Sequence, residues 1–322
     1  MERILTVNDL SVTYISKNKS TYAVCDASFV IDRGDSLGVV GESGSGKSTM
    51  AMALLRLLSE KSVDIDGQAD FCGEDLFAMN KNELAKLRWK KLSAVFQKSM
   101  NSLSPVHRIG DQIEDIYRIH EPSATHRQTR ERALKMLSLV NLNDRVYRLY
   151  PHELSGGMLQ RVMIAVSLLH EPDLLILDEA TTALDVVTQG QILEELRRME
   201  RELSTSRIII THDMSVVAAG CNRVAVMYAG HMLETGPVER ILRKPAHPYS
   251  RGLIAAFPPL KGDRVELKSI PGYLPDMTVR HEGCIFAPRC EDAQEKCRKE
   301  SPERSNLGDG HTVSCHFAGG EK

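Results

Sequence analysis

Residues 41–49 read GESGSGKST and stand between a strand-like run at 37–40 and an apolar stretch at 48–58 with the pattern of a helix. Glycines tolerate the backbone angles of a tight loop, whose N–H groups can wrap phosphate oxygens. The following helix directs its positive end toward the same phosphates. Lys47 would neutralise charge on the β- and γ-phosphates, and Ser48 would offer its hydroxyl to Mg²⁺. A chance glycine turn is the alternative, but the order of strand, loop and helix favours a phosphate-binding loop.

A second pattern, LLILDE at 174–179, is an apolar strand that ends in two carboxylates. Such a strand would deliver Asp178 to the metal ion through water, and it would direct Glu179 toward the γ-phosphate. Glu179 could then polarise the attacking water as a general base. Taken alone, the pattern is equally well explained by a strand that ends in solvated acids. Because a phosphate loop precedes it, we interpret it as part of a hydrolytic site.

A third pattern, LSGGMLQ at 154–160, opens a helix. Ser155 offers a hydroxyl, and Gly156 and Gly157 expose N–H groups at the positive end of the helix. One nucleotide does not need two such anion sites in one chain, so we expect a dimer in which this site faces the partner's ATP. A Ser-Gly-Gly turn with a helix cap would explain the motif if it stood alone.

The composition is that of an ordinary globular chain, with 42% hydrophobic and 26% charged residues and a formal net charge of -2. This balance does not mark the chain as a nucleic-acid binder. The sequence contains no run of about 18 apolar residues, so it predicts no membrane-spanning helix. The N-terminal residues lack the pattern of a secretory signal. We therefore expect cytosolic residence.

Alternating strands and helices predict an α/β fold in which a helical insert interrupts the core. The predicted strands are 4–14, 23–31, 37–40, 174–177, 207–211 and 223–228; the predicted helices after 48–58 are 110–119, 126–140, 157–169 and 188–203. We expect a nucleotide-binding domain over 1–245, with a helical subdomain at about 101–170. The residues from 246 to 322 are rich in proline and turns, which predicts an irregular extension held by something other than an apolar core.

Four of the seven cysteines crowd the C-terminal part with the spacing Cys284-x5-Cys290-x6-Cys297-x17-Cys315. In a reducing cytosol such a group indicates metal binding before disulfides. The short C-x2–4-C spacing that begins most structural zinc sites is missing. The longer spacings suit an iron–sulfur cluster, although zinc with mixed Cys and His ligands, free thiols and disulfides remain alternatives. The other cysteines, which we expect to be buried, are Cys25, Cys72 and Cys221.

Together the three patterns resemble the Walker A, Walker B and signature motifs of ATP-binding cassette (ABC) ATPases, and the likeness covers about residues 4–243. The resemblance implies an ABC-type P-loop fold, ATP and Mg²⁺ as ligands, and ATP hydrolysis as the activity. It assigns the Q-loop glutamine to Gln97, the switch histidine that senses the γ-phosphate to His212, and the D-loop aspartate to Asp185. Tyr14 resembles the aromatic that stacks on adenine.

The site residues implied by the resemblance fall into four groups. The catalytic residues are Glu179, His212, Gln97 and Lys47. The residues that bind ATP are Tyr14, Gly41, Ser43, Gly44, Ser45, Gly46, Lys47, Ser48, Thr49, Gln97, Asp178, Ser155, Gly156, Gly157 and Asp185. The Mg²⁺ ligands are Ser48, Gln97 and Asp178. The residues implied to hold a [4Fe–4S] cluster, with zinc as the alternative, are Cys284, Cys290, Cys297 and Cys315.

Residues 150–158, 247–253 and 283–290 resemble the importer ATPases for dipeptides and oligopeptides, a group that includes nickel and glutathione importers. The glycine-methionine form of the signature motif is similar to the first of the two ATPases of such systems. This implies a heterodimer with a second ATPase, two membrane permeases, an extracytoplasmic solute-binding protein, and a place on the cytoplasmic face of the membrane. Ala180 departs from the usual proline, and Lys98-Ser99 from the usual acidic-proline pair; the latter bears on the coupling surface rather than on ATP binding.

Other ABC proteins remain as rival interpretations. A soluble cassette protein of DNA repair or translation typically has two cassettes or a long coiled-coil insert, whereas this sequence has one cassette and no sustained heptads. An exporter ATPase would not be expected to carry the importer-like extension. A non-catalytic regulatory cassette would be expected to lack Glu179 or His212, and both are present.

Overall fold

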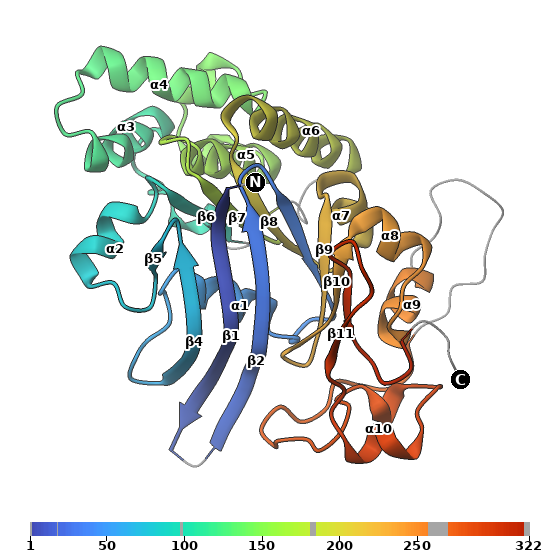
Figure 1. The fold of residues 1–322 in the computed structure, drawn as a ribbon. Helices are drawn as coiled ribbons and strands as arrows, with labels where there is room; N and C mark the ends of the chain where they lie inside the picture. Colours follow the sequence, from blue (N-terminus) through green and yellow to red (C-terminus); the bar gives the residue numbers. More distant parts are fainter. Residues whose placement is uncertain (1, 18, 97–98, 181–184, 257–269, 319–322) are drawn as a thin grey trace. The chain divides into compact units, whose positions relative to one another are not determined.

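The computed structural model describes residues 2–17, 19–96, 99–180, 185–256 and 270–318 as two compact units (Figure 1). The helical unit comprises residues 1–2, 32–35 and 78–209, and the phosphate-loop unit comprises 3–31, 36–77 and 210–322. The division falls within one strand, β8 (Ser206–Thr211). No helix in these described ranges has the length and apolar character needed to cross a membrane.

A four-stranded sheet in the order β2-β1-β4-β5 forms one part of the phosphate-loop unit. Its strands are β1 (Arg3–Ser16), β2 (Lys19–Asp32), β4 (Val63–Phe71) and β5 (Glu74–Asp75). β1 and β4 run antiparallel, from the pair Leu5 and Phe71 to the pair Tyr14 and Val63, with an irregularity between Asn8 and Ser11. Apolar residues alternate along β1 and point into the core, as in a sheet with one buried face.

The second sheet of this unit follows the order β11-β12-β10-β9-β3. Its strands are β3 (Ser36–Val40), β9 (Arg223–Tyr228), β10 (His231–Pro237), β11 (Arg304–Asn306) and β12 (Thr312–Ser314). β3 is buried along its whole length and pairs in parallel with β9, as its unbroken apolar run predicts. The C-terminal residues thus add strands to the edge at β10.

The short helices of the phosphate-loop unit carry or support the candidate sites. They are α1 (Lys47–Leu54), α7 (Met214–Gly220), α8 (Val238–Arg243), α9 (Pro248–Ala255), the 3₁₀ turn η4 (Ala287–Arg289) and α10 (Glu295–Lys299). Gly38 of β3 is needed for close packing, because a Cβ there would lie 2.5 Å from a methyl group of Val217. In Figure 1 the orange helix α8 lies beside the red segment around β11, and Arg240 of α8 donates a hydrogen bond to the Leu307 carbonyl oxygen at 2.8 Å.

The helical unit contains the parallel pair of β6 and β7, joined in register from Leu92 and Leu174 to Phe96 and Asp178. Its elements are α2 (Lys81–Leu87), β6 (Leu92–Phe96), η1 (Ser99–Ser102), α3 (Ile109–His120), α4 (His126–Leu139), η2 (Asp144–Arg148), η3 (Pro151–Glu153), α5 (Gly156–Ser167), β7 (Leu174–Asp178) and α6 (Val186–Leu203). Buried Glu114 joins α3 to α4, since its carboxylate accepts hydrogen bonds from Thr129 and Tyr147.

The predicted α/β core with a helical insert is confirmed, and several details of the prediction are wrong. The helix expected to reach 58 ends at Leu54, and Arg56 soon after it takes a left-handed φ of 53°. The extension is less irregular than expected, because it begins with α9 and ends with β11 and β12. Cys72 is exposed and Cys25 is half-buried, whereas Cys221 is buried as predicted.

Candidate functional site

The backbone of the phosphate loop depends on two glycines that no other residue could replace without movement. A Cβ on Gly41 would lie 1.9 Å from the Met227 carbonyl oxygen, and one on Gly46 would lie 2.0 Å from the Ala23 carbonyl oxygen. Gly46 also has a φ of 98° and stands at the N-cap of α1 without a side-chain cap. The first amides of α1 are therefore open to an anion.

Lys47 is directed onto the loop that precedes it. Its Nζ donates hydrogen bonds to the carbonyl oxygens of Gly41 and Glu42, both at 2.8 Å, and to Ser45 Oγ at 3.2 Å. The side chain is only 6% exposed, so its charge is focused on the loop. Ser43, Gly44 and Ser48 are exposed along the same segment.

Tyr14 and Thr49 connect the four-stranded sheet to the beginning of α1. The Tyr14 hydroxyl lies 3.3 Å from Thr49 Oγ1, and the tyrosine side chain is half-buried. By contrast, the Arg280 guanidinium covers one face of the Tyr22 ring at 5.0 Å from its centroid. The structure therefore places Tyr14 next to the helix that follows the phosphate loop.

Glu42 is a residue of the loop that sequence reasoning left without a role. Its backbone N–H donates to the Tyr249 hydroxyl at 3.1 Å. Both of its carboxylate oxygens accept from Arg289 Nη1 at 3.0 Å. Tyr249 and Arg289 are more than 200 positions away in the sequence, so no local pattern could have revealed these contacts.

In the helical unit, β7 ends at the two predicted carboxylates. Asp178 is the last residue of the buried strand and is 5% exposed. Glu179 follows it with a φ of 50°, in the left-handed region that costs a non-glycine residue about 1–2 kcal/mol. Strain of this kind is retained where the surrounding structure fixes a side chain for a function.

The signature segment begins α5 as predicted. Ser155 is the N-cap, and its Oγ accepts a hydrogen bond from Met158 N at 3.3 Å. Ser155 and Gly156 are exposed, while the helix buries its later residues. Asp185 caps α6 in the same unit by accepting from Thr188 N at 2.9 Å, and hydrogen bonding with Thr188 lowers the pKa of its carboxyl group.

The remaining residues of the predicted ATP site differ in exposure, and some of them lie outside the described residues. His212 is exposed directly after β8, in the phosphate-loop unit, before Asp213 caps α7. Gln97 lies outside the described residues, as do the D-loop residues Ala183 and Leu184. Gly157 is half-buried in the first turn of α5.

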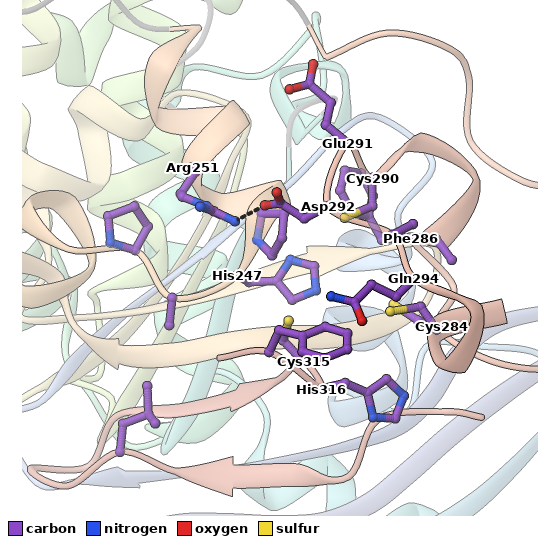
Figure 2. Close-up of a pocket in the computed structure, with 18 of the residues that line it drawn as sticks. His247, Arg251, Cys284, Phe286, Cys290, Glu291, Asp292, Gln294, Cys315 and His316 are labelled. Carbon is purple, nitrogen blue, oxygen red and sulfur yellow. Dashed lines mark hydrogen bonds and ion pairs between the residues drawn. The ribbon is translucent and has the colours of Figure 1, made fainter. Parts of the chain in front are cut away.

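The four C-terminal cysteines come together around one cavity of about 640 Å³ within the phosphate-loop unit. Figure 2 shows Cys284, Cys290 and Cys315 around this space, with His247 and Gln294 among them. Cys297, which is 8% exposed, also lines it. Across the described part of the chain, no three Cys, His, Asp or Glu side chains converge on the position of one metal ion.

Local geometry explains how two distant cysteines approach each other. Cys284 N donates to the Cys297 carbonyl oxygen at 2.7 Å. Gly283 permits this approach, because it has a φ of 75° and a Cβ there would lie 2.6 Å from that same oxygen. The four cavity cysteines have free thiols in the structure.

Burial favours the neutral form of three cysteines and one histidine around the cavity. It raises the pKa of Cys290 to about 11, and it raises the pKa of Cys284 and Cys315 as well. Burial lowers the pKa of His247 to about 3, and the Nδ1 of this histidine accepts a hydrogen bond from Tyr249 N at 3.0 Å. A metal centre bound here would have to displace thiol protons.

Comparison with known proteins indicates the same class of protein as the fold and the phosphate loop do. Residues 24–182 match the family described as ABC transporter, and residues 233–297 match the family described as oligopeptide/dipeptide transporter, C-terminal region. The dimeric structure of the bacterial ABC transporter cassette MJ0796 is similar with a TM-score of 0.67 and 28% identity, covering 73% of this chain and 99% of that one. Fold and phosphate loop therefore define an ABC-type P-loop ATPase.

Two similar proteins extend the likeness through the cysteine-containing extension. A peptide import ATP-binding protein of Brucella abortus is 43% identical over 307 residues, which are 95% of this chain and 92% of that protein. The oligopeptide transport ATP-binding protein OppD of Salmonella typhimurium is 43% identical over 301 residues, 93% of this chain and 89% of that protein. The chain belongs to the oligopeptide and dipeptide family of ABC transporter ATP-binding proteins.

Proposed function

We propose that this protein is the ATP-hydrolysing subunit that powers import of dipeptides or oligopeptides through a membrane ABC transporter. The observation that carries the proposal is the phosphate loop with its buried Lys47, followed in one chain by the extension typical of the peptide importer family. The proposed functional division is a nucleotide-binding domain over 1–245, with its helical subdomain at about 101–170, and an extension over 246–322.

The phosphate loop would bind the nucleotide in this mechanism. The amides at the start of α1 and the Lys47 ammonium would hold the β- and γ-phosphates, and Tyr14 would stack on adenine. Mg²⁺, when bound, would neutralise phosphate charge, held by Ser48, Gln97 and Asp178. The exposed Ser43, Gly44 and Ser48 leave this side of the loop accessible to a ligand.

Hydrolysis would depend on Glu179 and His212. Glu179 would accept a proton from the attacking water, and the fixed backbone at this residue would keep its carboxylate oriented. His212 would donate a hydrogen bond to the γ-phosphate and sense its presence. Because these assignments follow the family motifs residue by residue, each one is testable by substitution.

A second ATPase would complete the site. Ser155, Gly156 and Gly157 at the positive end of α5 would bind the γ-phosphate of the ATP held by the partner, and Asp185 would contribute at the same dimer interface. Exposure of Ser155, Gly156 and Asp185 supports this role. We propose a heterodimer bound to two permeases at the cytoplasmic face of the membrane, served by an extracytoplasmic solute-binding protein.

We propose further that Cys284, Cys290, Cys297 and Cys315 hold a [4Fe–4S] cluster. A cluster separates its four thiolates over several irons, whereas zinc draws four ligands to one point. Four cysteines that line one cavity without converging on a single position fit the cluster better than zinc. Its contribution would be structural, since it would hold together an extension with few buried apolar residues.

The substitution Glu179→Gln tests the catalytic assignment. We expect the variant to bind ATP with unchanged affinity and to lose at least about a hundredfold in turnover, because the amide cannot accept the proton of water. Phosphate release and nucleotide binding would be measured on the same preparation. Near-normal turnover would remove Glu179 from this role.

Isolation of the complex from its native membrane tests the assembly. We expect two multi-span permeases and a second, similar ATPase to be recovered with the protein and identified by mass spectrometry. A binding protein screened with peptides, nickel and glutathione would then identify the solute. Recovery with ribosomes or DNA-repair enzymes alone would contradict the transport function.

A further inference from the structure

The C-terminal extension contacts the phosphate loop directly within the phosphate-loop unit. Arg289, which precedes Cys290, places Nη1 at 3.0 Å from both carboxylate oxygens of Glu42. The Arg289 side chain is 7% exposed and that of Glu42 is 31% exposed, so solvent screens this ion pair only in part. Leu274, also in the extension, lies 3.4 Å from the position that a Cβ on Gly44 would occupy.

Besides its ion pair with Glu42, Arg289 forms hydrogen bonds with three other residues. Its Nε donates to the Pro271 carbonyl oxygen at 2.7 Å, and its Nη2 donates to the Ile270 carbonyl oxygen at 3.2 Å. Its Nη1 also lies 3.3 Å from the Tyr228 hydroxyl. One guanidinium therefore connects residues 270–271 of the extension, strand β9 and the phosphate loop to one another.

The backbone that carries Arg289 is braced on both sides by cysteines of the cavity. Cys284 O accepts from Ala287 N at 2.9 Å, and Cys290 N donates to Ala287 O at 3.3 Å, which closes the turn η4 that ends at Arg289. Phe286 packs against Tyr228 and Tyr249, with ring centroids 5.2 and 5.3 Å apart. The position of Arg289 thus depends on a turn that is closed by backbone hydrogen bonds of Cys284 and Cys290 and packed through the Phe286 ring.

Glu42 is held at each of its polar groups. Its N–H donates to Tyr249, its carbonyl oxygen accepts from Lys47 Nζ at 2.8 Å, and its carboxylate pairs with Arg289. Any change at the carboxylate would therefore be transmitted to the loop backbone and to the carbonyl oxygen that holds the Lys47 ammonium. Preorganised donors bind phosphate more tightly than donors that must be ordered on binding.

We propose that Arg289 is a positioning residue of the ATP site, by which the cysteine-braced extension fixes the phosphate loop through Glu42. This inference rests on the proposed function, because it requires ATP to bind at this loop. It assigns the extension a part in nucleotide affinity in addition to its own folding.

The test compares Mg-ATP affinity in four purified variants of the full chain. We expect Arg289→Ala and Glu42→Gln each to raise the Kd about tenfold, the loss expected when one charge-assisted hydrogen-bonded pair is removed. Combining Arg289→Ala with Glu42→Gln should weaken binding no more than either change alone. Arg289→Lys should restore part of the affinity, since an ammonium retains the charge but not the forked geometry.

The matched control is Arg304→Ala. Arg304 also anchors the extension, by donating to the Ser28 carbonyl oxygen at 2.6 Å, and its other hydrogen-bond partners, Thr235 and Thr312, lie on strands outside the phosphate loop. We expect its Kd to stay within about twofold of wild type. Equal weakening by Arg304→Ala, or additive losses in the double variant, would overturn the proposal.

A further variant, Phe286→Ala, tests the brace by removing the ring that packs against Tyr228 and Tyr249. We expect its ATP affinity to fall and to change no further when Arg289→Ala is added; unchanged affinity would overturn the part played by this turn. Failure of the wild type to bind Mg-ATP would refute the proposed function itself. Normal binding by wild type and by Arg289→Ala would refute only this inference.

Discussion

The phosphate loop and the cysteine cavity are both compact sites in one structural unit, yet they are specified in opposite ways. The loop takes its shape from nine consecutive residues and presents backbone N–H groups for the proposed phosphate contacts, and Gly41 and Gly46 permit that shape. The cavity draws its cysteines from positions 284 to 315 and depends on buried side chains that distant segments bring together. A contiguous motif therefore predicts geometry, whereas a dispersed one predicts only chemistry.

The two sites also differ in their electrostatics. The loop places the ammonium of Lys47 among carbonyl oxygens and is prepared for anions. Around the cavity, burial raises the pKa of Cys284 and Cys290 and lowers that of His247, which favours the neutral form of these three side chains. The following predictions test whether backbone shape controls the first site and side-chain chemistry the second.

The largest effect is expected from Gly46→Ala. The added methyl would lie 2.0 Å from the Ala23 carbonyl oxygen, at a φ of 98° that alanine rarely adopts, so the loop must move. We expect a loss of ATP affinity of about a hundredfold or more, a fall of about 3 kcal/mol in binding free energy. Nucleotide titration would measure it.

Gly156→Ala is the control for that change. Nothing lies within 4 Å of a Cβ at Gly156, so alanine fits and should leave the folding stability of the chain and its own ATP affinity unchanged. If both alanine variants bind ATP alike, backbone shape does not control the loop. A defect of Gly156→Ala in the assembled transporter only would place the residue at the partner's nucleotide.

An intermediate effect is expected from Cys297→Ser, which removes a buried thiol from the cavity. We expect bound iron to be lost and the free energy of unfolding to fall by about 3 kcal/mol or more, because the proposed metal centre would contribute its binding free energy to folding. Iron and zinc content, visible absorbance and chemical denaturation would measure both changes.

Cys72→Ser provides the comparison for the cavity, because Cys72 is exposed in a turn after β4. The free energy of unfolding of this variant should differ from that of the wild type by no more than about 0.5 kcal/mol, as at most surface positions. Metal content that survives Cys297→Ser would show that the cavity cysteines are not a ligand set. Stoichiometric zinc without iron in the wild type would favour the zinc alternative.

The smallest effect is expected from His247→Asn. Burial lowers the pKa of His247 to about 3, so the unfolded chain binds a proton below pH 6.5 that the folded chain does not. Its contribution to stability is therefore complete above pH 6.5 and declines as the pH falls toward 3. Asparagine can still cap α9 but does not titrate, so denaturation at pH 7 and pH 5 should show a weaker pH dependence. If the free energy of unfolding of the variant depends on pH as strongly as that of the wild type, the lowered pKa of His247 is contradicted.

Helix and strand ends show where local reasoning was sufficient. Ser155 and the Gly-Gly pair predicted the start of α5, and the apolar run at 174–177 predicted β7. The end of α1 was missed, because the apolar pattern continues to Leu58 while Arg56 adopts a left-handed turn. Strands β11 and β12 were missed because each has three residues and exists by pairing, β12 with the edge at β10 and β11 with β12.

The sequence alone determined the identity of the phosphate loop, the carboxylates at 178–179 and the signature helix, because each depends on backbone geometry encoded by neighbouring residues. It also identified the four C-terminal cysteines as one group. Only the tertiary structure placed Arg289 and Tyr249 on Glu42 and gathered four thiols around one cavity. The physical reason is range: hydrogen bonds within a loop are local, whereas an ion pair between positions 42 and 289 exists only after the intervening chain has folded.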